Sequence, residues 1–334
     1  IYGSSLRGFQ QATYQTQLKH YLRERQEPDD PPKQASLQIQ EESRLLQLSN
    51  IAYPVDSEDP GEACGEKGLS KCFHITRKQG KTEYRYKEGC PQFLDEDILG
   101  EFSAKIVSIL RCIRESDGIV FVYTNWIGSG VIPLVLALEQ NGYQKYDGST
   151  ILRGSQKRPP LSYKGKQLSG SEGIPAKYMV IAGTQENLTH NLAEELKVAT
   201  SRENSDGSRI KVIIGSSVAA EGLDFKCIRS IHVLEPWHNL NKVEQVIGRG
   251  VRNCSHRELS PEERNVTIYL HGVQDGAWET MDLRLYRYSE KKAKVIGDVE
   301  TILKQRAIDR HLFKNMNRLT DLEVAPVQVK PAYR

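Results

Sequence analysis

The stretch that most constrains the fold runs from residue 210 to residue 256. Two short apolar runs, 211–214 and 231–234, are each bounded by residues that favour turns. Runs of this kind predict buried strands. Asn239 is a candidate N-cap for a helix over 240–252. The stretch therefore predicts strand, loop, strand, loop and helix, an order typical of a parallel α/β sheet.

One face of the predicted helix carries an array of hydrogen-bond donors. Gln245, Arg249 and Arg252 follow one another at i, i+4 and i+7, so their side chains share that face. Arginine stays charged and presents a planar fork that suits phosphate oxygens. A surface helix whose arginines pair with Glu235 and Glu244 is the alternative that the helix alone leaves open.

Two motifs in order decide between these alternatives. Residues 245–252 match the Q-x-x-G-R-x-x-R of motif VI of superfamily 2 helicases, and residues 216–224 resemble their motif V. The chain thus resembles the C-terminal RecA-like lobe of a Swi/Snf-like helicase. The phrase EPWHNLNKVEQVIGR at 235–249, followed by NCSH, resembles the helicases of large cytoplasmic DNA viruses, relatives of the poxvirus nucleoside triphosphatase and early-transcription-factor ATPases.

The resemblance implies a role for each matching residue. Arg249 and Arg252 would meet the γ-phosphate of ATP, and Gln245 would orient that phosphate or the attacking water. Glu221 departs from the arginine that many RNA helicases have there, so coupling through that position is not implied. The resemblance places Gly222, Asp224 and Gly248 at the ATP site, with Asp224 near the ribose or coupled to the arginines. It places Thr124, Asn125, Thr184, Ser216 and Ser217 on the nucleic-acid backbone, where contacts are sequence-tolerant.

Three regions are expected along the chain. Residues 1–95 would be a helical lead-in and a polar loop joining two lobes, and 96–275 the RecA-like domain, with a basic insertion at 145–177. Residues 276–334 would be a helical extension and tail. The periodicity predicts helices over 1–26, 38–54, 97–116, 127–140, 191–199 and 278–313, loops over 27–33 and 55–94, and further strands over 119–123, 178–183 and 265–271. The fold class is therefore α/β, with a parallel sheet flanked by helices and with helical N- and C-terminal extensions.

The basic insertion leaves two interpretations open. It has Lys145, Arg153, Lys157, Arg158 and further lysines against Asp147 and Glu172, with little apolar content. Such a segment is either a contact for a phosphate backbone or a solvated loop. The chain as a whole has 46 basic and 43 acidic residues, so its net charge of +3 does not by itself indicate nucleic-acid binding.

The phosphate-binding loop of an ATPase is missing from the chain. Residues 80–82 are GKT, but a P-loop needs a glycine five residues earlier, where Ile75 stands. ATP and Mg²⁺ would therefore bind mainly to a first lobe outside this chain, and the chain alone should be inactive. The first residue is Ile1, so we expect a piece of a longer protein or a processed product.

No metal site is expected. The six cysteines include no C-x-x-C pair, and the spacing of Cys64, Cys72, His74 and Cys90 fits no common zinc pattern. Free thiols in a reducing compartment are the default expectation. The chain also has no apolar run long enough to cross a membrane.

The expected function is the second half of an ATP-dependent helicase or translocase, acting in viral transcription. The expected partners are DNA or RNA backbone, a first RecA-like lobe and transcription machinery such as RNA polymerase, without a membrane. The expected location is cytoplasmic, in a virus factory or virion if the protein is viral. The alternative is a non-catalytic nucleic-acid-binding or assembly subunit that keeps the helicase fold.

Overall fold

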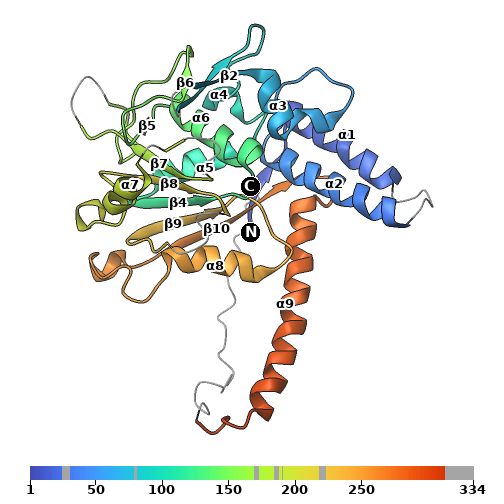
Figure 1. The fold of residues 1–334 in the computed structure, drawn as a ribbon, viewed down its shortest axis with the longest axis vertical. Coiled ribbons are helices and arrows are strands. Elements are labelled where there is room, and N and C mark those ends of the chain that lie inside the picture. Colours follow the sequence, from blue (N-terminus) through green and yellow to red (C-terminus); the bar gives the residue numbers. More distant parts are fainter. Residues whose placement is uncertain are drawn as a thin grey trace.

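The protein is built around a parallel sheet. The computed structural model describes residues 1–24, 31–78, 81–168, 173–183, 188–189, 191–217 and 223–312. Within these residues a seven-stranded sheet has the order β1-β10-β9-β4-β8-β7-β5, and every neighbouring pair is parallel (Figure 1). Its strands are β1 (Tyr2–Ser5), β4 (Ile119–Tyr123), β5 (Gln144–Lys145), β7 (Lys177–Ile181), β8 (Val212–Gly215), β9 (Ile228–Val233) and β10 (Thr267–Gln274). The α/β fold class is confirmed.

Helices cover both faces of the sheet. On β4, Val120 and Val122 face one layer and Phe121 faces the other, because successive strand side chains alternate. The first layer holds α5 (Ala104–Glu115) and α6 (Ile132–Gln140), the latter preceded by a π-turn at Ile127–Val131. The second layer holds α7 (Leu192–Ala199) and α8 (Leu240–Gly250). The helices predicted over 127–140, 191–199 and 240–252 are therefore confirmed, with α8 ending two residues early.

The N-terminal region differs from the expected single helix. Tyr2–Ser5 forms the edge strand β1, paired with β10, and α1 spans Gly8–Glu24. The second helix, α2 (Pro31–Asn50), begins inside the predicted loop. Proline is favoured in the first turn of a helix, where its missing N–H leaves no hydrogen bond unmade. Pro31 and Pro32 therefore begin α2, whereas Pro28 lies outside the described residues.

Residues 55–94 are not the polar loop that the sequence predicted. They contain a 3₁₀ turn at Pro60–Ala63, α3 (Gly65–Cys72) and the antiparallel strands β2 (Phe73–Lys78) and β3 (Lys81–Tyr86). With β6 (Leu152–Arg153) these strands form a three-stranded sheet. Phe73 and Tyr84 are buried in the same core as β4 and α5, so this sheet packs onto the main domain. Lys81 and Thr82 of the GKT sequence begin β3, whereas Gly80 lies outside the described residues.

The helix predicted over 97–116 is interrupted. A short helix α4 (Glu96–Leu99) precedes α5, and Ser103 caps α5 by accepting a hydrogen bond from the Ile106 N–H at 3.1 Å. The Ser103 hydroxyl also donates to the carbonyl of Asn50 at 2.5 Å. A serine that caps a helix favours a break over continuation, and here the break also joins α5 to α2.

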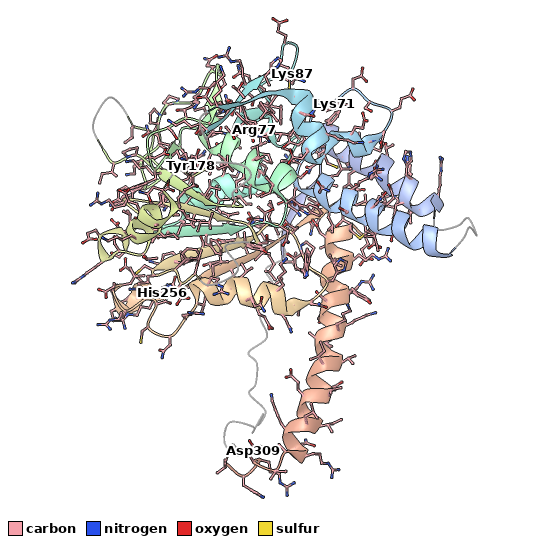
Figure 2. All side chains as sticks on the ribbon, viewed as in Figure 1. Lys71, Arg77, Lys87, Tyr178, His256 and Asp309 are labelled. Carbon is pink, nitrogen blue, oxygen red and sulfur yellow. The ribbon has the colours of Figure 1, made fainter. Side chains whose placement is uncertain are left out.

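The basic insertion is tied to the domain. Arg153 pairs with Glu83 at 2.8 Å, and Arg158 pairs with Asp95 at 2.6 Å. Glu139 of α6 is buried and accepts from the Lys157 ammonium at 2.8 Å. Glu139 also accepts from the hydroxyl of Tyr178, which Figure 2 labels, at 2.7 Å. These pairs engage three of the seven basic side chains of the insertion, which weakens the case for a free phosphate-binding loop.

The C-terminal helix α9 (Met281–Arg306) projects from the body (Figure 1). Met281 and Leu285 pack in a third core with α1 and α2, whereas Val295, Val299 and Leu303 are exposed. Within the described residues, no helix is both long and apolar enough to span a bilayer.

Candidate functional site

The motif VI helix lies against the first half of β9. A methyl group added at Gly250 would meet Ile231 Cδ1 at 3.0 Å and Ile228 Cβ at 3.2 Å, so this glycine allows close packing. The same addition at Gly248 would meet no atom within 4 Å. Gly250 therefore serves packing, whereas Gly248 leaves open space beside the arginines. Asn239 stands at the N-cap, but its side chain makes no capping hydrogen bond.

The motif V segment is joined to this helix through Arg249. The Phe225 N–H donates to the Arg249 carbonyl at 3.0 Å, and the Arg249 Nη1 donates to the Leu223 carbonyl at 3.3 Å. Arg249 is half-buried. Its guanidinium is thus positioned by backbone from the neighbouring motif, which reduces the entropy lost when it binds an anion.

Arg252 and Gln245 are more accessible. Arg252 forms an ion pair through Nη1 with Asp224 Oδ1, and both side chains are about half exposed, 48% and 58%. Gln245 is exposed one turn before Arg249. Asp224 is therefore coupled to an arginine, one of its two expected positions. Arg252 pairs with Asp224, and Glu235 accepts hydrogen bonds from Asn50 and Thr124, in contrast to the alternative of a surface helix whose arginines pair with Glu235 and Glu244.

Residues after Arg252 close the same corner. The Cys227 N–H donates to the Ser255 carbonyl at 3.0 Å, and His256 Nε2 lies 2.7 Å from the Ile228 carbonyl. Figure 2 labels His256 beside the C-terminal end of α8. Motifs V and VI are thus joined on both sides of Asp224 and Arg252, in support of one composite site.

The expected nucleic-acid residues lie at the other end of the strands. Thr124 N–H donates to the Gly215 carbonyl at 3.1 Å, and Ser216 N–H donates to the Ile181 carbonyl at 3.0 Å. These bonds bring the carboxyl ends of β4, β7 and β8 together, where open α/β sheets place ligands. The helix α8 begins after the carboxyl end of β9 and spans about 16 Å, with Arg249 in its last turn. The arginines and this edge of the sheet therefore form two separate regions. Thr184 and Gly222 lie outside the described residues.

Accessibility divides the residues of this edge. Ser217 is exposed and Asn125 is half-buried, whereas Thr124 and Ser216 are buried. The Thr124 hydroxyl donates to Glu235 at 3.1 Å. Thr124 and Ser216 therefore position the loops, and Asn125 and Ser217 are the ones that an external strand can reach.

Sequence reasoning missed a buried polar network behind this edge. Glu235, two residues after the end of β9, accepts hydrogen bonds from the Asn50 amide at 3.0 Å and from the Asn125 N–H. Burial raises the pKa of the Glu235 carboxyl, and the hydrogen bonds and Lys105 partly oppose the shift. A charged residue at the end of an apolar strand was visible in the sequence. Its partners were not, because Asn50 is 185 positions away.

Lys105 extends the network to the C-terminal helix. It donates to the Leu234 carbonyl at 2.8 Å and to Asn50 Oδ1 at 3.0 Å. Its ammonium also pairs with Asp282 of α9 at 2.7 Å, with both side chains fully buried. The network therefore links α2, α5 and α9 to the loops that end β4 and β9.

The arginine corner has the chemistry of an anion site. Arg249 and Arg252 both contact the motif V segment, at Leu223 and Asp224, and Gln245 is exposed one turn before Arg249. Such an array stabilises charge on a transferred phosphoryl group. Among the described residues, no three histidine, cysteine or acidic side chains gather to hold a metal ion.

Comparisons with known proteins identify the domain. Residues 172–254 match the helicase conserved C-terminal domain, which covers motifs V and VI together. The chain contains the C-terminal lobe of a superfamily 2 helicase. This helicase lobe is related to those of viral helicases, as three relatives show.

The relatives come from large DNA viruses. The helicase lobe is 30% identical over 259 residues to a putative ATP-dependent RNA helicase, R563, of Acanthamoeba polyphaga mimivirus, covering 76% of this chain and 40% of that protein. It is 28% identical over 252 residues to a termination factor NPH-I homolog of African swine fever virus, covering 69% and 36%. It is 30% identical over 213 residues to an early transcription factor large subunit homolog of African swine fever virus, covering 63% and 19%.

The chain spans 40% or less of the length of these relatives. A solved structure, the C-terminal part of the Fun30 ATPase domain, is 12% identical with a TM-score of 0.47, covering 86% of this chain and 87% of that one.

Proposed function

We propose that this chain is the second lobe of an ATP-dependent helicase or translocase that moves along DNA or RNA. A first lobe would bind ATP and Mg²⁺, and closure would bring Arg249 and Arg252 onto the γ-phosphate. The observation that carries the proposal is the joining of motif V to motif VI through Arg249, whose guanidinium and carbonyl both bond to residues 223–225. Movement of one motif must therefore move the other.

Arg252 would exchange partners during this closure. Its pairing with Asp224 is solvent-exposed, and exposed ion pairs are weak. A γ-phosphate carries more negative charge than one carboxylate and can displace it. Gln245, exposed one turn before Arg249, would then face the phosphate or the attacking water. Gly248 leaves room for the nucleotide, and Gly222 keeps its expected place at the ATP site as a prediction.

The nucleic-acid backbone would cross the carboxyl edge of the sheet. Asn125 and Ser217 would contact phosphate or sugar directly, and Thr124 and Ser216 would hold their loops in place. Contact to Thr184 stays a prediction. Because these groups are neutral amides and hydroxyls that reach the backbone and not base edges, we expect sequence-tolerant binding.

A role in transcription is the finer part of the proposal. Two of the viral relatives are named as a termination factor homolog and an early transcription factor subunit homolog. RNA polymerase or another part of a transcription machinery is therefore the proposed partner, in a cytoplasmic virus factory or virion. The second candidate is a non-catalytic nucleic-acid-binding or assembly subunit that keeps the helicase fold.

Nucleic-acid-stimulated ATP hydrolysis by the longer protein that carries the first lobe tests the proposal. We expect Arg249→Ala to lower stimulated turnover by a factor on the order of 10³, the range of arginine fingers. Arg287→Ala is the matched control. Arg287 is an exposed arginine of α9 that pairs with Glu279, which precedes that helix. Full turnover in the Arg249 variant would refute the role of this arginine. No turnover in the intact protein, with nucleic-acid binding kept, would establish the assembly subunit instead.

A further inference from the structure

A surface hollow lies between α1 and the turn that joins β10 to α9. Its volume is about 330 Å³, and it is lined by Gln15, Leu18, Lys19, Leu22, Arg23 and Trp278. We name these six residues the Trp278 groove. None belongs to α8 or to the carboxyl ends of β4 and β8, so the groove is separate from the ATP and nucleic-acid regions.

One side of the groove is an exposed apolar surface. Trp278 is 58% exposed and Leu22 is 36% exposed. Leu18 and Leu22 are four residues apart on α1, so they form one continuous aliphatic surface beside the indole. Trp278 presents a large contact area at low entropic cost, and tryptophan is enriched where binding energy concentrates.

The turn that carries Trp278 is held in place before any partner arrives. The backbone N–H of Trp278 donates to the Asp275 carbonyl at 2.9 Å. The Asp275 carboxylate accepts hydrogen bonds from Gln11 at 2.9 Å and from Gln15 at 3.0 Å, both from α1. The hydroxyl of Tyr14 accepts from the Met281 N–H at 2.8 Å. Both walls of the groove are thus fixed to each other, which lowers the entropy cost of binding.

The other side of the groove is basic. Lys19 and Arg23 are exposed and lie four residues apart on α1. Neither side chain forms an ion pair with another described residue. Two nearby acidic groups of the described residues are occupied: Asp275 is buried and bonded to the glutamines, and Glu279 pairs with Arg287 at 2.7 Å. The groove therefore attracts negative charge.

We propose that the Trp278 groove docks an acidic amphipathic segment of a partner protein. Apolar side chains of that segment pack on Trp278 and Leu22, and its carboxylates pair with Lys19 and Arg23. A single-stranded nucleic acid fits less well, because stacking platforms use successive aromatic rings and this groove has one ring beside two leucines. The proposal does not depend on ATP hydrolysis by the longer protein.

Binding of a defined peptide to the full chain tests the proposal. The probe is a fluorescein-labelled peptide of about ten residues, glutamates with two leucines four positions apart, whose anisotropy is measured. We expect saturable binding that Trp278→Ala weakens about tenfold or more, as for a hot-spot residue. Trp278→Phe should restore most of the affinity. Tyr288→Ala, which removes an exposed aromatic of α9 outside the groove, should bind like the unchanged chain.

Charge reversal separates the groove from non-specific attraction. Lys19→Glu with Arg23→Glu should abolish binding of the acidic peptide and create binding of the same peptide with lysines in place of glutamates. Equal binding of acidic and basic peptides by the unchanged chain would overturn the proposal, as would acidic-peptide binding that survives both Trp278→Ala and the charge reversal. Binding of oligo(dT) or oligo(U) that Trp278→Ala removes, without binding of the acidic peptide, would overturn it in favour of a nucleic-acid site.

Discussion

At the scale of single residues, Lys105 is a buried cation held by several partners. Its ammonium is fully buried and reaches Asp282, Asn50, Ser49 and the Leu234 carbonyl. A buried charge is tolerated only when it is paired and hydrogen-bonded. Lys105, on α5, satisfies this condition with groups from two other helices, α2 and α9, and from the end of β9, so the network fixes how α9 meets the sheet.

Removal of this charge should destabilise the domain. Lys105→Met leaves Asp282 buried without its cation, which typically costs about 3–5 kcal/mol. Urea unfolding followed by circular dichroism measures the loss. Lys304→Met is the control, because its pair with Glu300 on α9 is 3.8 Å long and solvent-exposed, and its removal should change stability little. Equal midpoints for the two variants would show that the buried pair contributes nothing.

At the scale of elements, α8 combines packing and function on opposite faces. Val243 and Val246 are buried against the sheet, whereas Gln245 is exposed and Gly248 faces open space. The two glycines of the motif look equivalent in sequence, but glycine is suited to each position for a different physical reason. One lies against β9 and the other lies beside the arginines.

Substituting alanine at each glycine should distinguish close packing at Gly250 from open space at Gly248. Gly250→Ala should destabilise the domain by about 1–3 kcal/mol, the usual cost of overpacking, since its methyl group meets Ile231 and Ile228. Gly248→Ala should stabilise the helix by about 1 kcal/mol, yet lower ATP turnover in the longer protein if a nucleotide approaches there. Chemical unfolding of both variants is the measurement. A destabilised Gly248→Ala would contradict the open space seen at this position.

At the scale of the whole molecule, the sheet encloses a pair of neutral histidines. His232 Nδ1 on β9 lies 2.9 Å from His271 Nε2 on β10, and both rings are fully buried. Tyr269 stacks on His232 with ring centres 4.4 Å apart. Burial lowers the pKa of His232 to about 3, and burial with its neighbours His232 and Lys105 lowers the pKa of His271 well below its usual value.

Acid should therefore unfold the domain through these rings. An unfolded histidine takes up a proton near pH 6.5, whereas the folded rings stay neutral, so stability is present above that pH and is lost as pH falls toward about 3. Each ring contributes a slope of up to about 1.4 kcal/mol per pH unit. Urea midpoints between pH 7.5 and pH 5 measure it. His232→Gln should reduce the slope and His238→Gln, at an exposed position, should not; equal slopes for both would refute the assignment.

The sequence by itself determined the structural features that depend on residues close together along the chain. Apolar runs predicted β4, β7, β8 and β9, and the spacing of Gln245 and Arg249 predicted a shared helical face. Arg252, the third residue of that prediction, lies beyond the end of α8 at Gly250 and is not on that face. Both patterns are local, since the two periodicities, of strand and helix, are properties of adjacent residues. The order of motifs V and VI likewise indicated the helicase lobe before any contact was known.

Tertiary structure decided the features that depend on distant partners. Tyr2–Ser5 becomes a strand only because β10 offers its edge, and the polar segment at 55–94 becomes a sheet because Phe73 and Tyr84 reach the core. The Glu235 network and the Trp278 groove join residues more than 180 positions apart. Hydrogen bonds and burial between such residues follow from chain topology, which no local pattern contains.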